Sequence, residues 1–194
     1  MKTIGVLLFE NFTLLDAFGP IEVLARLGGG IEIHYVSKSG GLISGTGNAK
    51  VATEPTQGKD AFDLFLVPGG LGTRRLVEEE PILEYIRTQS ERATHVLSVC
   101  TGSALLAKAG VLNRRRATSN KRAWDWVVQQ GPEVEWIRKA RWVVDGKFFT
   151  SAGVAAGIDM ALGFVADQVG AATAESLAHT VEYVWNSDKT SDPF

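Results

Sequence analysis

The segment Val96-Leu97-Ser98-Val99-Cys100-Thr101-Gly102-Ser103 joins a short apolar run to a run of small residues, and the fold can be inferred outward from it. A continuous apolar run of strand length is typical of a strand covered on both faces in a parallel sheet. Apolar residues at helical spacing continue from Leu105 to Ala109 and stop at Gly110, a common residue just past a helix end. The segment therefore predicts a buried strand that turns directly into a helix, with Cys100 at the turn.

Strand and helix patterns alternate through the rest of the chain. Further strands are expected at 4–9, 31–37 and 63–67, and two hairpins are expected to end at Pro55 and Phe149. Helices are expected to begin near Pro20 and Pro81, to form briefly at Trp124, and to span 157–169 and 172–185. Short connections between alternating elements predict an α/β fold, with an open, mostly parallel twisted sheet, helices on both faces and a β-hairpin addition.

The composition is that of a globular domain. The chain has 194 residues, 45% hydrophobic and 22% charged, which excludes a disordered, collagen-like or disulfide-scaffold protein. Lys and Arg number 20 against 22 Asp and Glu, so the net charge of -2 gives no overall attraction to nucleic acid or anionic membranes. We expect one domain over residues 1–187 and a flexible tail over 188–194.

Targeting signals are not apparent. The N-terminal apolar run meets Glu10 and Asn11 too early for a signal-peptide core, and no apolar stretch approaches the ~18 residues that span a bilayer. A cytoplasmic, reducing location is therefore expected. Cys100 is the single cysteine, so an internal disulfide and a multi-cysteine metal site are both excluded.

The predicted sheet brings three segments to one edge. In open parallel sheets, ligands bind beyond the carboxyl ends of the strands. Residues 10–19, Pro68-Gly69-Gly70-Leu71-Gly72 and Cys100-Thr101-Gly102 each follow a predicted strand. We therefore expect these segments to converge on a site for a small molecule.

Cys100 is the candidate nucleophile. A residue at a sharp strand-to-helix turn projects from the sheet, as in the nucleophile elbow of hydrolases. The free amides and the dipole at the helix N-terminus favour a thiolate, so a thiol pKa below the free value of ~8.5 is expected. The alternative is a buried structural cysteine, which is common after an apolar strand.

Two further features are expected to face the same crevice. Pro68-Gly69-Gly70 allows backbone amides to approach a ligand as in an oxyanion hole, although it also suits a simple tight turn. Asp16 lies in the apolar stretch Leu14-Leu15-Asp16-Ala17-Phe18, so it is a candidate acid or base; the alternative is a helix-capping role.

Other polar and aromatic residues offer no comparable signal. None of the three histidines, His34, His95 and His179, falls in a loop at the carboxyl edge, so local sequence does not support a Cys-His pair. The run 114–116, three arginines, has no interleaved aromatic residues and is interpreted as a solvated turn. The five tryptophans lie in apolar periodic segments and are expected in the core or in a subunit interface.

Several segments together resemble the ThiJ/PfpI superfamily, whose class I glutamine amidotransferase-like fold is flavodoxin-like. They are Gly5-Val6-Leu7-Leu8-Phe9, Thr13-Leu14-Leu15-Asp16-Ala17-Phe18-Gly19-Pro20, Val67-Pro68-Gly69-Gly70, Ser98-Val99-Cys100-Thr101-Gly102 and Gly157-Ile158-Asp159. The Leu-Asp-x-x-Gly-Pro stretch and the Cys-Thr-Gly turn are similar to the isocyanide (isonitrile) hydratase branch. Ligand-binding domains of some AraC-type regulators share these features.

The resemblance implies specific roles. Cys100 would attack the terminal carbon of R–NC, Asp16 would act as acid and base, and Thr101 would supply a supporting hydroxyl. The substrate and its oxyanion would be bound at the following backbone positions: Gly69, Gly70, Leu71 and Gly102. The implied reaction passes through a thioimidate to an N-formamide in a homodimer, with no metal or organic cofactor.

The chain departs from related patterns at two positions. Asn120 follows Ala117-Thr118-Ser119, where many relatives carry a histidine, and Thr101 stands where peptidase and glyoxalase-like branches have a histidine. Two alternatives to the hydratase therefore stay open. One is a stress sensor based on oxidation of Cys100, and the other is a noncatalytic small-molecule binder.

Overall fold

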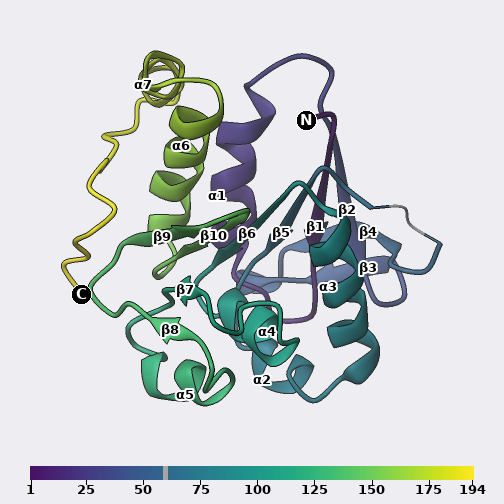
Figure 1. Ribbon diagram of the computed structural model, residues 1–194. Coiled ribbons are helices and arrows are strands. Elements are labelled where there is room, and N and C mark those ends of the chain that lie inside the picture. Colours follow the sequence, from purple (N-terminus) through teal and green to yellow (C-terminus); the bar gives the residue numbers. More distant parts are fainter. Residues whose placement is uncertain (59–60) are drawn as a thin grey trace.

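The protein folds around an eight-stranded sheet (Figure 1). The structure is a computed structural model, and it describes residues 1–58 and 61–194. The strand order is β3-β4-β2-β1-β5-β6-β10-β9. The strands are β1 (Thr3–Leu7), β2 (Glu32–Ser37), β3 (Gly41–Ser44), β4 (Lys50–Pro55), β5 (Leu64–Val67), β6 (His95–Val99), β9 (Trp142–Asp145) and β10 (Phe148–Ser151). Neighbouring strands from β4 to β10 are parallel, and β3 and β9 pair antiparallel at the two edges. The predicted fold class is confirmed, with a hairpin at each edge.

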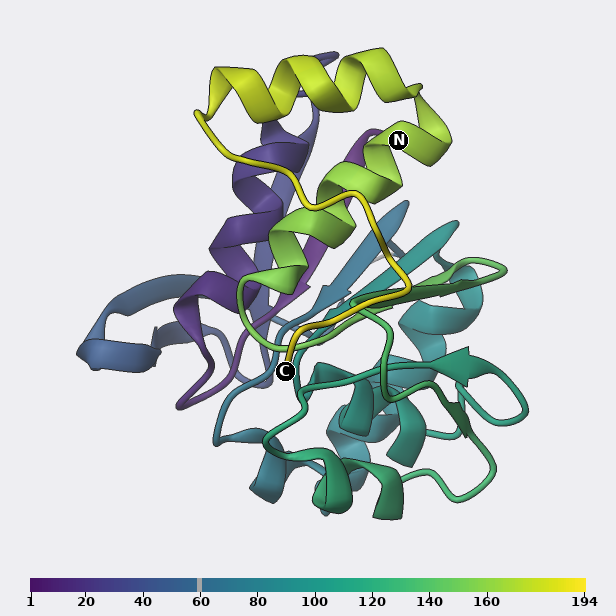
Figure 2. The same cartoon turned by 90° about the vertical axis from the view of Figure 1, so that its left-hand side faces the viewer.

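Helices cover both faces of the sheet (Figures 1 and 2). One face carries α1 (Leu14–Ala25), α6 (Ala156–Gln168) and α7 (Ala171–Thr180), and the other carries α2 (Thr73–Leu76), α3 (Glu80–Arg92), α4 (Gly102–Lys108) and α5 (Trp124–Gln129). A short 3-10 helix spans Thr46–Asn48, and β7 (Arg116–Ala117) pairs with β8 (Glu135–Trp136) in a separate ribbon. Among the described residues, every helix is too short or too polar to cross a membrane.

The register of the central strands determines which loops meet. The strands β5 and β6 are buried along nearly their whole length, as their apolar runs predict. Val67 of β5 pairs with Ser98 of β6, and Val99 pairs with Ser151 of β10. The loops that begin at Pro68, Cys100 and Ala152 therefore leave the same edge of the sheet side by side.

Two predicted helix boundaries were wrong. Helix α1 begins at Leu14, so Pro20 lies inside the helix rather than in its first turn. Proline removes one helical hydrogen bond, but Gly19 and Pro20 pack against α6, and this tertiary contact offsets the loss. Helix α7 ends at Thr180, before the predicted Trp185, because Glu182 has a left-handed φ of 50° that a helix does not continue through. Beyond this turn, the Trp185 indole donates to the Asp159 carbonyl at 3.2 Å.

The segment 188–194 makes hydrogen bonds and ion pairs with the rest of the domain. The chain after α7 runs back along α6 (Figure 2). The Lys189 carbonyl accepts a hydrogen bond from the Arg141 amide at 2.9 Å. The Asp192 carboxylate is buried and pairs with Arg141 at 3.3 Å and with Lys121 at 3.7 Å. This buried ion pair is a long-range contact, which local sequence patterns do not reveal.

Candidate active site

Cys100 occupies the turn between β6 and α4, as predicted. Its φ of 58° lies in the left-handed region, where a non-glycine residue costs on the order of 1–3 kcal/mol. Polar contacts hold this conformation, because Ser119 Oγ donates to the Cys100 carbonyl at 2.8 Å and Ser103 Oγ donates to it at 3.1 Å. Such local strain, maintained by the surrounding fold, is typical of functional positions.

Two glycines allow the chain segments around Cys100 to approach closely. A Cβ on Gly102 would lie 2.1 Å from the Val67 carbonyl oxygen, so only glycine lets α4 begin directly beside β5. A Cβ on Gly69 would lie 2.6 Å from the Thr101 nitrogen and 2.8 Å from Asp16 Oδ2. These glycines permit the carboxyl, the elbow and the Gly69 loop to meet.

Asp16 lies fully buried in the first turn of α1. Its Oδ2 accepts a hydrogen bond from the Gly69 amide at 3.0 Å. Its Oδ1 has no partner of good hydrogen-bond geometry among the described residues, and the Cys100 thiol is close enough to interact with the carboxyl as a donor. Burial raises the Asp16 pKa to about 7, against the weaker lowering by Gly69 and Cys100. The helix-cap alternative was wrong, because Thr13 is the N-cap residue.

Burial and the neighbouring Asp16 charge raise the pKa of the Cys100 thiol to about 12. The amides of Thr101 and Val154 and the side chain of Asn120 act in the opposite direction, because they donate toward the sulfur. The expectation of a lowered pKa was therefore wrong. The thiol is only 6% exposed, and desolvation outweighs the helix N-terminus. At neutral pH the thiol is protonated.

The backbone amides of Gly69 and Gly70 bind protein side chains. The Gly69 amide donates to Asp16, and the Gly70 amide donates to Thr101 Oγ1 at 3.0 Å. Thr73 Oγ1 donates to the Gly70 carbonyl at 2.8 Å and lies 3.2 Å from Thr101 Oγ1. The glycine turn therefore fixes the orientation of the Asp16 carboxyl and the Thr101 hydroxyl.

A cavity of about 370 Å³ opens over the thiol. Its lining residues are Thr13, Gly70, Leu71, Arg74, Cys100, Thr101, Asn120, Arg122, Ala123 and Val154. Four of the predicted site residues are in this lining, whereas Asp16, Gly69 and Gly102 lie outside it. Asp16 and Gly69 nevertheless contact the elbow from behind, and Gly102 begins its helix.

Sequence reasoning missed several lining residues. Val154 follows β10, and only the pairing of β10 with β6 brings its amide to the sulfur. Asn120 stood out as a departure from related sequences, but its contact with the thiol could not be foreseen. Arg74 comes from the short helix α2, which no periodic pattern indicated.

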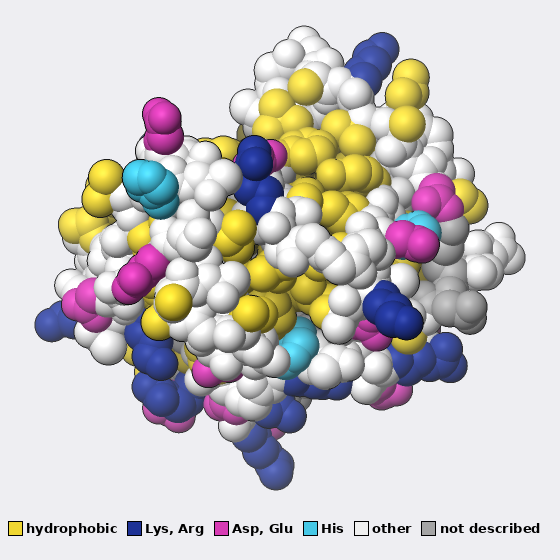
Figure 3. Space-filling model, turned by 90° about the horizontal axis from the view of Figure 1, so that it is seen from above, with side chains coloured by type: hydrophobic (Ala, Val, Ile, Leu, Met, Phe, Trp, Pro, Cys, Tyr) yellow, Lys and Arg dark blue, Asp and Glu magenta, His cyan; other side chains and the backbone are white. Residues whose placement is uncertain are grey.

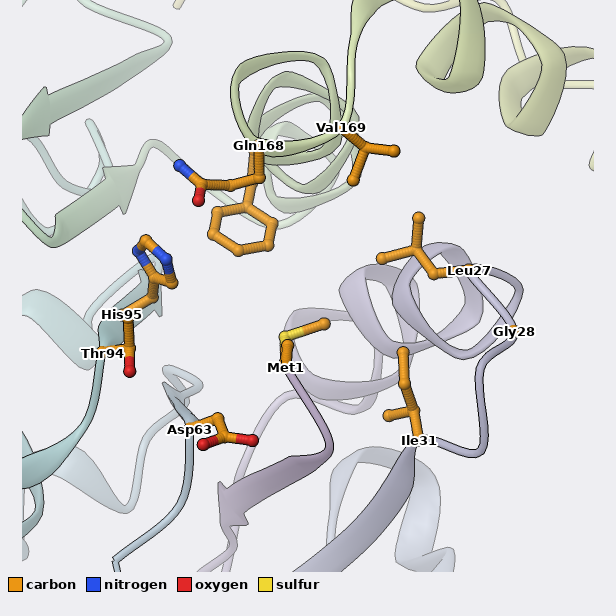
Figure 4. A pocket seen from close by; sticks show the side chains of 10 residues that line it. Met1, Leu27, Gly28, Ile31, Asp63, Thr94, His95, Gln168 and Val169 are labelled. Atoms are coloured by element: carbon orange, nitrogen blue, oxygen red, sulfur yellow. The ribbon is translucent and has the colours of Figure 1, made fainter.

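A larger cavity, of about 450 Å³, lies at the opposite edge of the sheet (Figure 4). Figure 3 shows an apolar area on this face of the molecule. The Asp63 carboxylate there accepts hydrogen bonds from the Lys2 and Thr3 amides, which gives it a structural role. Burial lowers the pKa of His95, whose ring lies near Gln168 in Figure 4. We assign the candidate active site to the smaller cavity because the strained Cys100 lines it and the buried Asp16 carboxyl interacts with Cys100.

No group of three or more His, Cys, Asp or Glu side chains is placed to hold a metal ion in the described part of the chain. Residues 2–167 match the model of the DJ-1/PfpI family.

The chain belongs to the DJ-1/PfpI family. It is 38% identical to the isonitrile hydratase of Pseudomonas putida over 183 residues, which covers 93% of this chain and 78% of that protein. It is 28% identical to the HTH-type transcriptional regulator GbdR of Pseudomonas aeruginosa over 87% of this chain and 47% of the regulator. The crystal structure of a ThiJ/PfpI family protein from Pseudomonas syringae superposes with a TM-score of 0.86 at 28% identity, covering 100% of this chain and 77% of that one.

Membership in the DJ-1/PfpI family confirms the resemblance and the fold predicted from the sequence. The relatives include an enzyme and a regulator, and this chain spans about half the length of the regulator. The likeness to an isonitrile hydratase supports a hydratase-like role.

Proposed function

We propose that this protein is a cysteine-dependent hydratase that adds water to an isocyanide, R–NC, to give an N-formamide. The observation that carries the proposal is the contact between a strained thiol, Cys100, and a buried carboxyl, Asp16, at a cavity that admits a small molecule. The likeness to the Pseudomonas putida isonitrile hydratase supports it.

The protonation of the Cys100–Asp16 pair suits this chemistry. With pKa values of about 7 for the carboxyl and about 12 for the thiol, the pair holds a single proton through the intervening pH range. The terminal carbon of an isocyanide must gain both a nucleophile and a proton. A pair that shares one proton supplies a thiolate and an acid together, although the resting thiol is neutral.

In the first half of the proposed reaction, the thiol adds across the isocyanide carbon. Asp16 accepts the proton of the Cys100 thiol, the sulfur forms a bond to the terminal carbon, and Asp16 delivers the proton to that carbon. The product is a thioimidate, R–N=CH–S–Cys100, and no electrons are gained or lost overall. The amides of Thr101 and Val154 donate toward the sulfur and stabilise the charge that develops there.

In the second half, water replaces the sulfur. Asp16, again ionised, removes a proton from water as the water oxygen bonds to the thioimidate carbon, and passes this proton to the nitrogen. The C–S bond of the resulting intermediate then breaks, the remaining hydroxyl proton passes to the sulfur, and R–NH–CHO leaves. The sum is R–NC plus water, so all atoms are accounted for.

Two alternatives have weaker support. An oxidation sensor needs an accessible thiolate, whereas Cys100 is 6% exposed and has a raised pKa. A noncatalytic binder would not need the contact between the thiol and a proton-accepting carboxyl.

The proposal includes a cytoplasmic location, where the thiol stays reduced. It also includes a homodimer that covers Leu71, which lines the cavity and is 77% exposed; light scattering measures the subunit number.

Formamide production tests the proposed reaction. The protein is incubated with cyclohexyl isocyanide, and N-cyclohexylformamide is quantified by chromatography. We expect turnover by the native protein and none above background by Cys100→Ala, with Ser176→Ala, an exposed change on α7, as the control. Equal turnover by native protein and Cys100→Ala, or no turnover by either, would refute the proposal.

A further inference from the structure

Two arginines, Arg74 and Arg122, line the cavity over Cys100. Neither forms an ion pair with a carboxylate among the residues that the structure describes, whereas the adjacent Arg75 pairs with Glu79 at 3.0 Å. Unpaired surface arginines are common, but these two share one cavity with the candidate nucleophile. Their position in the cavity lining makes them candidate binding groups.

Arg74 is held in place. Its guanidinium lies 4.0 Å from the centre of the Trp126 ring, and Nη1 donates to Thr73 Oγ1 at 3.2 Å. Stacking on tryptophan restricts a guanidinium to one plane and leaves its edge open. A guanidinium has five N–H donors, so a single hydrogen bond to Thr73 leaves most of them available. When Cys100 is ionised, its sulfur interacts with the charge of Arg74, which agrees with the place of both residues in the lining of one cavity.

The cavity lining carries positive charge without an acidic residue. The same lining includes the apolar side chains of Leu71, Ala123 and Val154. Asp16 is outside the lining and fully buried. A ligand that fits this distribution has a small apolar part near the thiol and an anionic group near the arginines.

We propose that the substrate is an isocyanide that carries a carboxylate, and that Arg74, assisted by Arg122, binds the carboxylate and determines this specificity. This inference rests on the proposed function. A carboxylate is favoured because the open edge of a planar guanidinium matches its two oxygens in a bidentate pair. The cavity volume of about 370 Å³ is large enough for a small isocyanide that carries a carboxylate.

The test compares two substrates that differ in charge and by one methyl group, isocyanoacetate and its methyl ester. Values of kcat/KM for formamide formation are measured on the full chain for the native protein, Arg74→Gln, Arg122→Gln and Arg75→Gln. Arg75 is the matched control, since it is adjacent in sequence, is paired with Glu79 and lies outside the cavity. We expect the native protein and Arg75→Gln to prefer the acid by about tenfold or more.

We expect the preference to fall toward one in Arg74→Gln, mainly through a higher KM for the acid, and to fall less in Arg122→Gln. Added salt should weaken the native preference, because it screens exposed charges. Turnover of both compounds with equal kcat/KM, or an unchanged preference in Arg74→Gln, would overturn this inference and leave the hydratase proposal standing. Turnover of neither compound, nor of cyclohexyl isocyanide, would overturn both.

Discussion

Replacing Asp16 by asparagine should change the reactivity and the activity of Cys100 in opposite directions. The substitution keeps the size of the side chain and an oxygen that can accept the Gly69 hydrogen bond, but removes the charge beside the thiol. In the native protein the thiol pKa of about 12 leaves a thiolate fraction of about one in 10⁴ at pH 8.

The size of the effect follows from the charge that is lost. A like charge in contact typically shifts a pKa by about 1–3, and the Asp16 charge is the second largest cause of the raised thiol pKa, after burial. The Asp16→Asn variant should therefore hold at least roughly ten times more thiolate at pH 8. Hydration of an isocyanide should fall by about 100-fold or more, because the general acid and base is lost.

The assay is the rate of Cys100 alkylation by iodoacetamide, followed by intact-protein mass spectrometry, beside formamide production. Asp167→Asn, at the exposed C-terminal end of α6, is the matched control and should change neither rate. Faster alkylation with lost turnover agrees with the proposed pair. Slower or unchanged alkylation in a folded Asp16→Asn variant would show that the carboxyl does not hold the thiol protonated.

Three further outcomes follow from the structure. Because the Asp16 pKa is raised from 3.8 to about 7, the folded protein binds the carboxyl proton more tightly than the unfolded chain does. The stability that this proton contributes is complete below pH 3.8 and is lost as the pH rises to 7. Urea unfolding should show up to about 4 kcal/mol of this loss in the native protein and not in Asp16→Asn, and identical pH profiles would contradict it. Gly102→Ala should destabilise the protein by about 3 kcal/mol or more, because the new Cβ would lie 2.1 Å from the Val67 carbonyl oxygen. Gly29→Ala, with open space around it, should cost about 1 kcal/mol. Equal melting temperatures of the two variants would argue against the close approach of Gly102 to β5. Asp192→Asn should cost about 3 kcal/mol in thermal unfolding, because the buried Lys121 loses its carboxylate partner and Arg141 keeps only its pair with Asp159 at 2.6 Å. The exposed control Glu175→Gln should be neutral, and a neutral Asp192→Asn would mean that this carboxylate does not hold the C-terminal segment.

The sequence was sufficient to predict the parallel sheet and the position of Cys100, because both depend on local patterns. A buried apolar strand followed by small residues indicates a sharp turn into a helix, and the parallel pairing of β5 with β6 brings the Gly69-Gly70 turn beside it. Pro20 was placed wrongly because its cost within α1 is offset by packing on α6, a contact between residues far apart in the sequence.

The electrostatics of the candidate site could not be predicted from the sequence. The helix N-terminus at Cys100 suggested a reactive thiolate, but the pKa depends on burial and on Asp16, which lies in another element. The contacts of the sulfur with Asn120 and the Val154 amide depend on how separate loops pack. The position of Arg74 also depends on tertiary packing, since it lies on Trp126 of a different helix.

Rapid-quench mass spectrometry of the protein mixed with cyclohexyl isocyanide tests covalent hydration at Cys100 most directly. We expect a transient adduct whose added mass equals that of the isocyanide, located on the peptide that contains Cys100, and its decay at the rate of formamide release. Formamide release by the native protein without such an adduct, or an adduct on another residue, would rule out covalent hydration at Cys100.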